Sequence, residues 1–143
     1  MINISFIGMA ACGKSTIGKA VANKIGVSFV DTDLLIEQKH EATLEEIKNK
    51  YDYKFVRDEE EKVILSLTSS NRIISTGGSA VYSAKSMQHL KKFSKVIYIN
   101  TPLEIIMQRI DIGQKRGLAV PEGMSIPEIY SERELSFRID LRN

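Results

Sequence analysis

Residues 8–16 read Gly-Met-Ala-Ala-Cys-Gly-Lys-Ser-Thr, which contains the pattern G-x-x-x-x-G-K-[ST] in full. An apolar run at residues 2–7 precedes this stretch and predicts a buried strand, while residues 14–25 carry apolar side chains at helical spacing. Gly8 and Gly13 allow a tight turn whose N–H groups point inward, where they can bind phosphate oxygens at the start of a helix. The stretch therefore predicts a phosphate-binding loop rather than an incidental glycine-rich turn.

Two side chains of this loop suit a nucleotide with a bound metal ion. Lys14 is expected to reach the β- and γ-phosphates of ATP, and the Ser15 hydroxyl is expected to bind Mg²⁺. Cys12, the single cysteine, is interpreted as a small side chain beside the loop in preference to a reactive thiol. The predicted nucleotide-binding residues of the loop are Gly8, Ala10, Ala11, Cys12, Gly13, Lys14, Ser15 and Thr16.

Outside the loop, apolar runs bounded by turn residues alternate with stretches of helical spacing. Further strands are predicted at residues 27–30, 72–75 and 95–99. Helices are predicted at residues 14–25, 34–40, 56–67, 83–91 and 125–141, with a capping box at Thr43 and Glu46 and a further helix capped by Thr101. Residues 112–123 contain three Gly and one Pro, which is typical of a mobile loop. The alternation predicts a three-layer α/β fold with helices on both faces of a parallel sheet.

The bulk composition indicates one globular domain over residues 1–143, with 43% hydrophobic and 27% charged residues. No run approaches the roughly 18 apolar residues of a membrane span, and the N-terminus lacks the basic segment of a signal peptide. A single cysteine cannot form an internal disulfide, which fits a reducing cytoplasm. The net charge of +2 gives no indication of nucleic-acid binding. We expect a monomer that acts on a small molecule.

Two carboxylates, Asp31 and Asp33, follow the predicted strand at residues 27–30. Residues two apart on a strand point to the same side, and ligands of such sheets bind at the carboxyl ends of the strands. Asp31 is therefore a candidate for holding Mg²⁺ through water, and Asp33 for accepting a proton from a substrate hydroxyl. The alternative for Asp33 is a helix cap before Leu34.

Other candidates are weaker from their local sequence alone. Gly77 and Gly78 directly follow a predicted strand, which indicates either a turn or a close approach of the backbone to a ligand. Arg57 lies in a charge-dense helical stretch that is typical of a solvated surface. Three further arginines, Arg109, Arg116 and Arg133, are scattered through the last third of the chain, and Arg116 lies in the predicted mobile loop, which could close as a lid.

In combination, these elements resemble the shikimate kinase family, a branch of the nucleoside-monophosphate-kinase-like P-loop proteins. The resemblance runs through nearly the whole chain in order. The matching elements are the loop at residues 8–16, Asp31-Thr32-Asp33, Arg57 with Glu60, Gly77-Gly78-Ser79, Arg109, Arg116, and Arg133 with Phe137. The chain differs from the family pattern at Val56, which replaces an aromatic residue, and at Ser79, which replaces a third glycine.

The resemblance implies the sheet order 2-3-1-4-5, a lid at about residues 112–124, and a fifth strand that is missing or truncated because the sequence ends at Asn143. It implies that ATP and Mg²⁺ are used to phosphorylate shikimate. Under this hypothesis the catalytic residues are Lys14, Asp33 and Arg116, and the nucleotide also contacts Arg109. The implied substrate-binding residues are Asp33, Arg57, Gly77, Gly78 and Arg133, and the implied metal-binding residues are Ser15 and Asp31. The alternatives are a gluconate-type kinase and an ATP-binding module without catalysis.

Overall fold

A parallel four-stranded sheet forms the centre of the molecule, in the order β2-β3-β1-β4. The computed structural model describes residues 1–142, with side chains as far as residue 139. The strands are β1 (Asn3–Ile7), β2 (Ser28–Asp31), β3 (Arg72–Ser75) and β4 (Lys95–Tyr98). In the central strand, Ile4 pairs with Ile73 on one side and with Lys95 on the other. This order confirms the first four positions of the predicted topology, and residues 1–142 contain no fifth strand.

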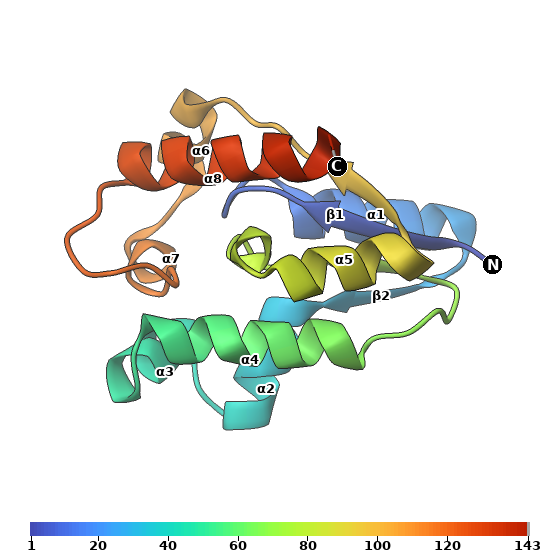
Figure 1. Ribbon diagram of the computed structural model, residues 1–143, viewed down its shortest axis with the longest axis horizontal. Helices are drawn as coiled ribbons and strands as arrows, with labels where there is room; N and C mark the ends of the chain where they lie inside the picture. The colour runs from blue at the N-terminus through green and yellow to red at the C-terminus, as the bar shows by residue number, and fades with distance from the viewer. Residues whose placement is uncertain (143) are drawn as a thin grey trace.

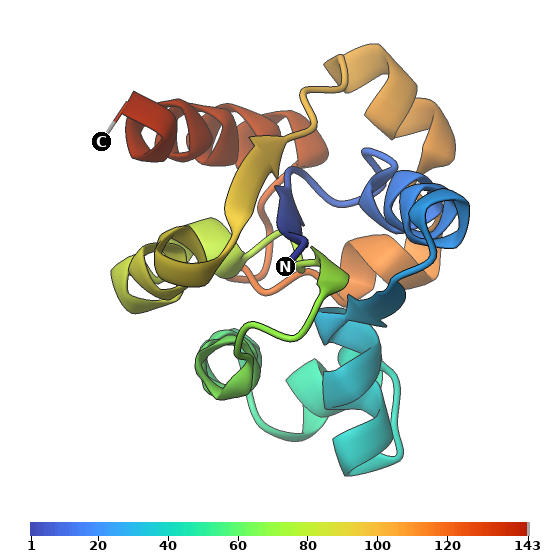
Figure 2. The same cartoon turned by 90° about the vertical axis from the view of Figure 1, so that its right-hand side faces the viewer.

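Helices cover both faces of this sheet, as Figures 1 and 2 show. Seen along the strands in Figure 2, α1 and α6 lie on one side of the sheet and α4 and α5 lie on the other. The helices are α1 (Lys14–Ile25), α2 (Thr32–His40), α3 (Leu44–Lys50), α4 (Tyr53–Ser66), the short 3₁₀ helix η1 (Ala80–Tyr82), α5 (Ala84–Phe93), α6 (Leu103–Arg109), α7 (Ile112–Arg116) and α8 (Ile126–Arg142). This arrangement confirms the three-layer α/β fold.

Adjacent residues of β3 point to opposite faces of the sheet, where each packs in a different hydrophobic cluster. Ile73 packs with Phe6 and Ala22 beneath α1, whereas Ile74 packs with Ile64 and Leu90 beneath α4 and α5. Both isoleucines are fully buried, and burying such a side chain contributes about 1.5–3 kcal/mol. Two consecutive apolar residues, one for each face, are what a strand covered on both faces requires.

Most predicted elements are confirmed, and three local predictions are wrong. The capping box of Thr43 and Glu46 forms at the start of α3. Thr101 does not cap α6, because its hydroxyl donates to the Cys12 carbonyl oxygen at 2.8 Å and Pro102 takes the cap position instead. The predicted loop at residues 112–123 begins with the helix α7, which a capping box of Asp111 with Gln114 stabilises.

The third correction concerns the start of α2, which begins at Thr32 and not at residue 34. The Asp31 carboxylate caps this helix, since its Oδ1 accepts hydrogen bonds from the N–H groups of Asp33 and Leu34 at 2.9 and 3.3 Å. Asp33 is therefore not the cap. It also does not share a strand with Asp31, because β2 ends at Asp31 and Asp33 lies in the first turn of α2.

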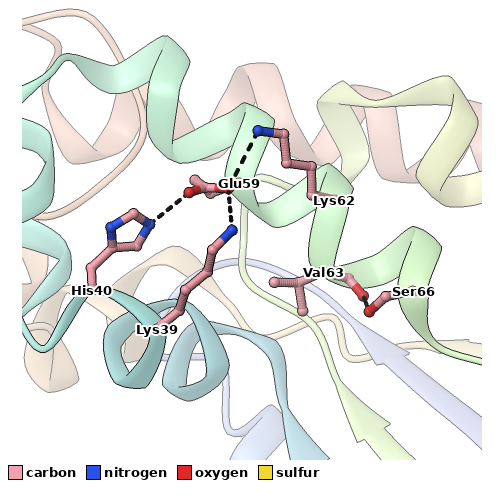
Figure 3. Close-up of polar contacts among 6 residues, drawn as sticks. All are labelled: Lys39, His40, Glu59, Lys62, Val63 and Ser66. Carbon is pink, nitrogen blue, oxygen red and sulfur yellow. Dashed lines mark hydrogen bonds and ion pairs between the residues drawn. The ribbon is translucent and has the colours of Figure 1, made fainter.

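A buried carboxylate joins α2 to α4 (Figure 3). Glu59 accepts hydrogen bonds from His40 at 2.6 Å and from Lys39 at 3.2 Å, and Lys62 lies 3.9 Å from the same carboxylate. Burial alone raises the pKa of Glu59, but the contacts with His40 and Lys39 outweigh it and lower the pKa overall. This cluster fixes the position of α4 against the helix that follows β2.

Among residues 1–142, no helix combines the length and hydropathy that crossing a membrane requires.

Candidate active site

The turn from β1 into α1 has a backbone that only glycine fits at two positions. Gly8 has φ 155° and Gly13 has φ 105°, both in a region that L side chains rarely adopt. A Cβ on Gly8 would also lie 2.7 Å from the carbonyl oxygen of Ile99 and 2.8 Å from the Cys12 sulfur. Ala11 lies in the same turn in a left-handed conformation with φ 62°, which is strained for a residue with a side chain. The predicted phosphate-loop turn is therefore present at the start of α1.

The ammonium group of Lys14 lies inside this turn. It donates to the carbonyl oxygens of Gly8 at 2.6 Å and Met9 at 2.9 Å, and the side chain is buried. Among the residues whose side chains are described, no carboxylate forms an ion pair with this ammonium group. The turn therefore presents a buried positive charge at the N-terminus of α1, which is an arrangement that binds phosphate.

Ser15 connects this turn to the neighbouring strand ends. Its hydroxyl donates to Asp31 Oδ2 at 2.5 Å and lies 3.2 Å from the hydroxyl of Ser75 at the end of β3. Hydroxyl and carboxylate oxygens are the ligands that Mg²⁺ prefers. The donor set of Ser15 and Asp31 therefore fits the predicted metal ion.

Two carboxyl groups flank Gly77, that of Asp33 on α2 and that of Glu60 on α4. A Cβ on Gly77 would collide with both of them, so a side chain there would force both carboxyl groups to shift. Burial and then the neighbouring Asp31 raise the pKa of Asp33 to about 6. Burial and then Asp33 raise the pKa of Glu60 to about 8. Near neutral pH, Asp33 is therefore mostly ionised while Glu60 holds a proton.

Glu60 is a site residue that local sequence reasoning missed. It lies in a run of acidic residues that reads as a solvated helix surface, yet it is 2% exposed. Its Oε2 accepts a hydrogen bond from Ser79 at 3.2 Å, and its Oε1 has no hydrogen-bond partner among the described residues. In the sequence, Glu60 is singled out by the family resemblance alone, which pairs it with Arg57, three residues earlier on the same side of α4.

Arg57 and Arg133 converge on one aromatic ring beyond the glycine turn. The guanidinium carbon of Arg57 lies 3.8 Å from the centroid of the Tyr82 ring, and that of Arg133 lies 5.4 Å from it. Arg133 is 1% exposed, its Nη2 has no hydrogen-bond partner among the described residues, and its Nη1 lies 2.5 Å from where a Cβ on Gly78 would be. Tyr82 is a second residue that the sequence did not single out, because nothing in its local pattern distinguishes it.

A cavity of about 1000 Å³ extends from the phosphate-loop turn across the carboxyl ends of the strands to α3 and α7. The predicted site residues that line it are Ala10, Ala11, Cys12, Gly13, Lys14, Ser15, Thr16, Asp31, Asp33, Gly78 and Arg109. The predicted residues outside its lining are Gly8, Arg57, Gly77, Arg116 and Arg133. Its volume is in the range of pockets that bind small molecules and cofactors.

The two arginines predicted to contact the nucleotide lie in different surroundings. Arg109 lines the cavity, and its Nη1 lies 3.5 Å from the carbonyl oxygen of Cys12 in the phosphate-loop turn. Arg116, in contrast, is 68% exposed at its side chain and pairs with Glu45 on α3 at 3.7 Å. A role for Arg116 at the transferring group therefore requires its side chain to leave this pair.

This fold and site define the class of protein. A parallel sheet in the order β2-β3-β1-β4, a phosphate-binding turn with a buried lysine, and a hydroxyl–carboxylate pair beside it are the parts of a P-loop phosphotransferase. The chain belongs to the shikimate kinase family: the family model for shikimate kinase matches residues 10–139.

Individual relatives agree with this assignment. The chain is 33% identical over 135 residues to a shikimate kinase of Persephonella marina, covering 94% of this chain and 82% of that protein. It is 37% identical over 111 residues to a shikimate kinase of Clostridium botulinum, covering 77% of this chain but 65% of that protein. Among solved structures, the shikimate kinase of Acinetobacter baumannii in complex with shikimate superposes with a TM-score of 0.81 at 27% identity, over 98% of this chain and 80% of that chain.

Proposed function

We propose that this chain transfers the γ-phosphoryl group of ATP to the 3-hydroxyl of shikimate, a step in the biosynthesis of chorismate and the aromatic amino acids. The observation that carries the proposal is the position of the Gly77-Gly78 turn. The cavity with Lys14 and Asp33 lies against this turn, and so does the buried, partly unpartnered guanidinium of Arg133. A phosphate site and a carboxylate site therefore adjoin each other, as a kinase acting on a hydroxy acid requires.

On the nucleotide side, the inward N–H groups of residues 8–16 and the Lys14 ammonium would bind the β- and γ-phosphates of ATP. Arg109 would contact the nucleotide from the other wall of the cavity. Ser15 and Asp31 would hold Mg²⁺, which when bound neutralises charge on the phosphate oxygens. The 2.5 Å contact between the Ser15 hydroxyl and the Asp31 carboxylate supports this assignment, because both oxygens already face one another.

On the acceptor side, the guanidinium groups of Arg57 and Arg133 would bind the shikimate carboxylate, since planar guanidinium forks match carboxylate geometry. The backbone of Gly77 and Gly78 would lie against the ring, and Asp33 would accept a hydrogen bond from the attacking hydroxyl. With a pKa of about 6, Asp33 is ionised at neutral pH. Because this pKa is close to neutral pH, Asp33 can also take up a proton during the reaction.

In the transfer step, negative charge spreads over the phosphoryl group as its bond to the ADP oxygen weakens and the bond to the substrate oxygen forms. Lys14 would stabilise this charge from the phosphate-loop turn, and Arg116 would do so after a lid at about residues 112–124 closes. Asp33 would receive the hydroxyl proton. The products are ADP and shikimate 3-phosphate.

We also propose that the chain acts as one kinase domain, as a monomer and in the cytoplasm, where a single cysteine stays reduced. Cys12 is the one cysteine among residues 1–139, whose side chains are described, and it is buried and forms no disulfide.

A coupled assay of ADP release tests the function directly. Purified protein with ATP and Mg²⁺ is measured with shikimate, with gluconate and with no acceptor. We expect rapid ADP release with shikimate only. Release with gluconate in preference to shikimate would support a gluconate-type kinase. Saturable ATP binding without release under any condition would show an ATP-binding module without catalysis, and would overturn the proposal.

A further inference from the structure

The ring of Tyr82 is shared by the two arginines that adjoin the glycine turn. Tyr82 ends the helix η1, four residues after Gly78. The Arg57 guanidinium lies over its face at 3.8 Å, while the Arg133 guanidinium lies 5.4 Å from the same ring centroid. At its edge, the Tyr82 hydroxyl accepts a hydrogen bond from Arg133 Nε at 3.4 Å and donates one to Glu132 at 2.6 Å. One side chain therefore contacts both cations through different parts of its surface.

Two guanidinium groups this close to one ring repel each other unless something offsets their charge. Burial lowers the pKa of Arg57, and the positive charge of the neighbouring Arg133 lowers it further. The buried carboxyl group of Glu60, which also interacts electrostatically with Arg133, has a pKa raised to about 8 and is largely protonated at neutral pH. The ionised Asp33 acts electrostatically on Arg133, and the carboxylate of Glu132, which is exposed, reaches the cluster through the Tyr82 hydroxyl.

The other contacts of the two arginines hold each of them separately. Arg57 donates from Nε to the carbonyl oxygen of Ala119 at 2.7 Å and lies 4.9 Å from the ring of Tyr53. Arg133 Nη1 lies 3.9 Å from the Met9 sulfur, which is a weak acceptor. Among the described contacts, Tyr82 is the one side chain that touches both guanidinium groups. Their spacing before a ligand arrives therefore depends on this ring.

We propose that Tyr82 is a positioning residue, which holds the guanidinium groups of Arg57 and Arg133 at a fixed spacing for the acceptor's carboxylate. This inference rests on the proposed function, in which those two arginines bind the carboxylate. The aromatic face stabilises Arg57 as a cation, and the hydroxyl orients Arg133. Binding then loses less side-chain freedom than it would with two mobile arginines. Tyr82 itself takes no part in phosphoryl transfer.

The test compares Tyr82→Met, which removes the ring but keeps an apolar side chain, with Tyr82→Phe, which keeps the ring and removes the hydroxyl. Shikimate affinity is measured by calorimetry, and KM for each substrate and kcat are measured by ADP release. For Tyr82→Met we expect the Kd and KM for shikimate to rise about tenfold, with KM for ATP and kcat within about twofold of the unaltered protein. For Tyr82→Phe we expect a rise of about twofold to threefold in the shikimate Kd.

A matched control is Tyr98→Met, because Tyr98 is also partly buried and stacks on Phe137 with ring centroids 5.0 Å apart, but contacts neither arginine in the described contacts. We expect this variant to lose thermal stability without a change in the shikimate Kd. Tyr82 is itself only half-buried, so its removal opens space to solvent. If Tyr82→Met does not fold, Tyr82→Thr takes its place with the same expected rise in Kd.

The outcomes separate this inference from the proposed function. If the unaltered protein binds ATP but not shikimate, the proposed function fails and the inference fails with it. If the unaltered protein binds shikimate and Tyr82→Met binds it equally well, only the inference is overturned. A rise in the KM for ATP parallel to that for shikimate would indicate a general structural role and would also overturn it.

Discussion

Glu59 and Glu60 are consecutive residues of α4 and both are almost completely buried, yet their carboxyl groups lie in opposite electrostatic surroundings. Glu59 contacts His40 and Lys39, which lower its pKa against the effect of burial. Glu60 faces Asp33 across Gly77, and burial together with that carboxylate raises its pKa to about 8. One of the two therefore stabilises the fold as an anion, while the other holds a proton beside the proposed substrate site.

The first prediction concerns Glu59→Gln, which removes the charge but keeps the shape of the side chain. Because charge-assisted hydrogen bonds to a buried group contribute about 1.5–3 kcal/mol, we expect the free energy of unfolding to fall by about 2 kcal/mol at pH 7. In the unaltered protein this contribution is fully present above the ordinary pKa of glutamate and is lost as the pH falls through the lowered folded pKa. Urea denaturation at pH 7 and at acidic pH measures both effects.

The control for this prediction is Lys62→Gln, since Lys62 is exposed and lies 3.9 Å from the same carboxylate. An exposed pair of this kind contributes at most about 1 kcal/mol. Equal losses from Lys62→Gln and Glu59→Gln would contradict a special role for the contacts with His40 and Lys39.

The second prediction concerns Glu60→Gln and has the opposite dependence on pH. The folded pKa of Glu60 is about 8, whereas its ordinary value is 4.5, so between these values the folded protein binds more protons than the unfolded chain. The stability of the unaltered protein must then fall as the pH rises through this window, at most by about 1.4 kcal/mol per pH unit for one proton. Glu60→Gln should show a flatter dependence. Parallel curves for the two proteins between pH 5 and pH 8 would refute the raised pKa.

The third prediction concerns the strained backbone of Ala11. A left-handed conformation costs a residue with a side chain roughly 1–2 kcal/mol relative to glycine, and part of this is offset by the greater freedom of glycine in the unfolded chain. We expect Ala11→Gly to raise the free energy of unfolding by about 0.5–1 kcal/mol. Ala10→Gly is the control, because Ala10 does not have a positive φ and the same substitution should not stabilise there. Thermal melts compare the Tm of both variants with that of the unaltered protein. A lower Tm for Ala11→Gly would show that the strain is absent.

The fourth prediction concerns the ammonium group inside the phosphate-loop turn. Lys14→Met should lower kcat by a factor on the order of 10²–10³ or more, because one electrostatic contact to a developing charge is removed. The melting temperature should fall only modestly, since the two hydrogen bonds lost are to the carbonyl oxygens of the turn itself. Lys19→Met, on the exposed side of the same helix, should leave kcat unchanged. Turnover by Lys14→Met at the unaltered rate would contradict the mechanism.

The fifth prediction concerns the pair of Arg116 with Glu45. If Arg116 reaches the transferring group after the lid closes, Arg116→Ala should lower kcat by about 10²-fold. Glu45→Gln should keep kcat or raise it by about twofold, because it frees Arg116 from a largely exposed pair that contributes at most about 1 kcal/mol. Steady-state kinetics with saturating substrates measure both. A kcat for Arg116→Ala equal to that of the unaltered protein would remove this residue from the mechanism.

The parts of the site that could be predicted from the sequence are those in which local spacing dictates geometry. Residues 8–16 specify their turn because two glycines supply the positive φ angles and the next residues start a helix. In the same way, Thr43 and Glu46 specify the start of α3, because a capping box joins residues three apart. Such features depend on a few consecutive residues, and the fold hardly alters them.

Features that depend on distant residues were mispredicted or missed. Thr101 precedes Pro102 like a helix cap, but its hydroxyl bonds to Cys12, a residue that is 89 positions away and only adjacent because β1 and β4 pair. The five residues of α7 were not predicted as a helix, because Gly113 lies among them and Gly117 directly follows them. The acidic run that contains Glu59 and Glu60 looked solvated, although α4 packs both of them inward.

The sequence by itself therefore determined the phosphate-loop turn, the four strands and their parallel arrangement, because each follows from backbone preferences and apolar periodicity along a short stretch. The tertiary structure alone decided which charged groups are buried and what surrounds them. It placed Asp33 and Glu60 on either side of Gly77, and it brought Arg57 and Arg133 to the ring of Tyr82. Desolvation and electrostatic contact act through space, so the state of these groups is fixed only when the chain has folded.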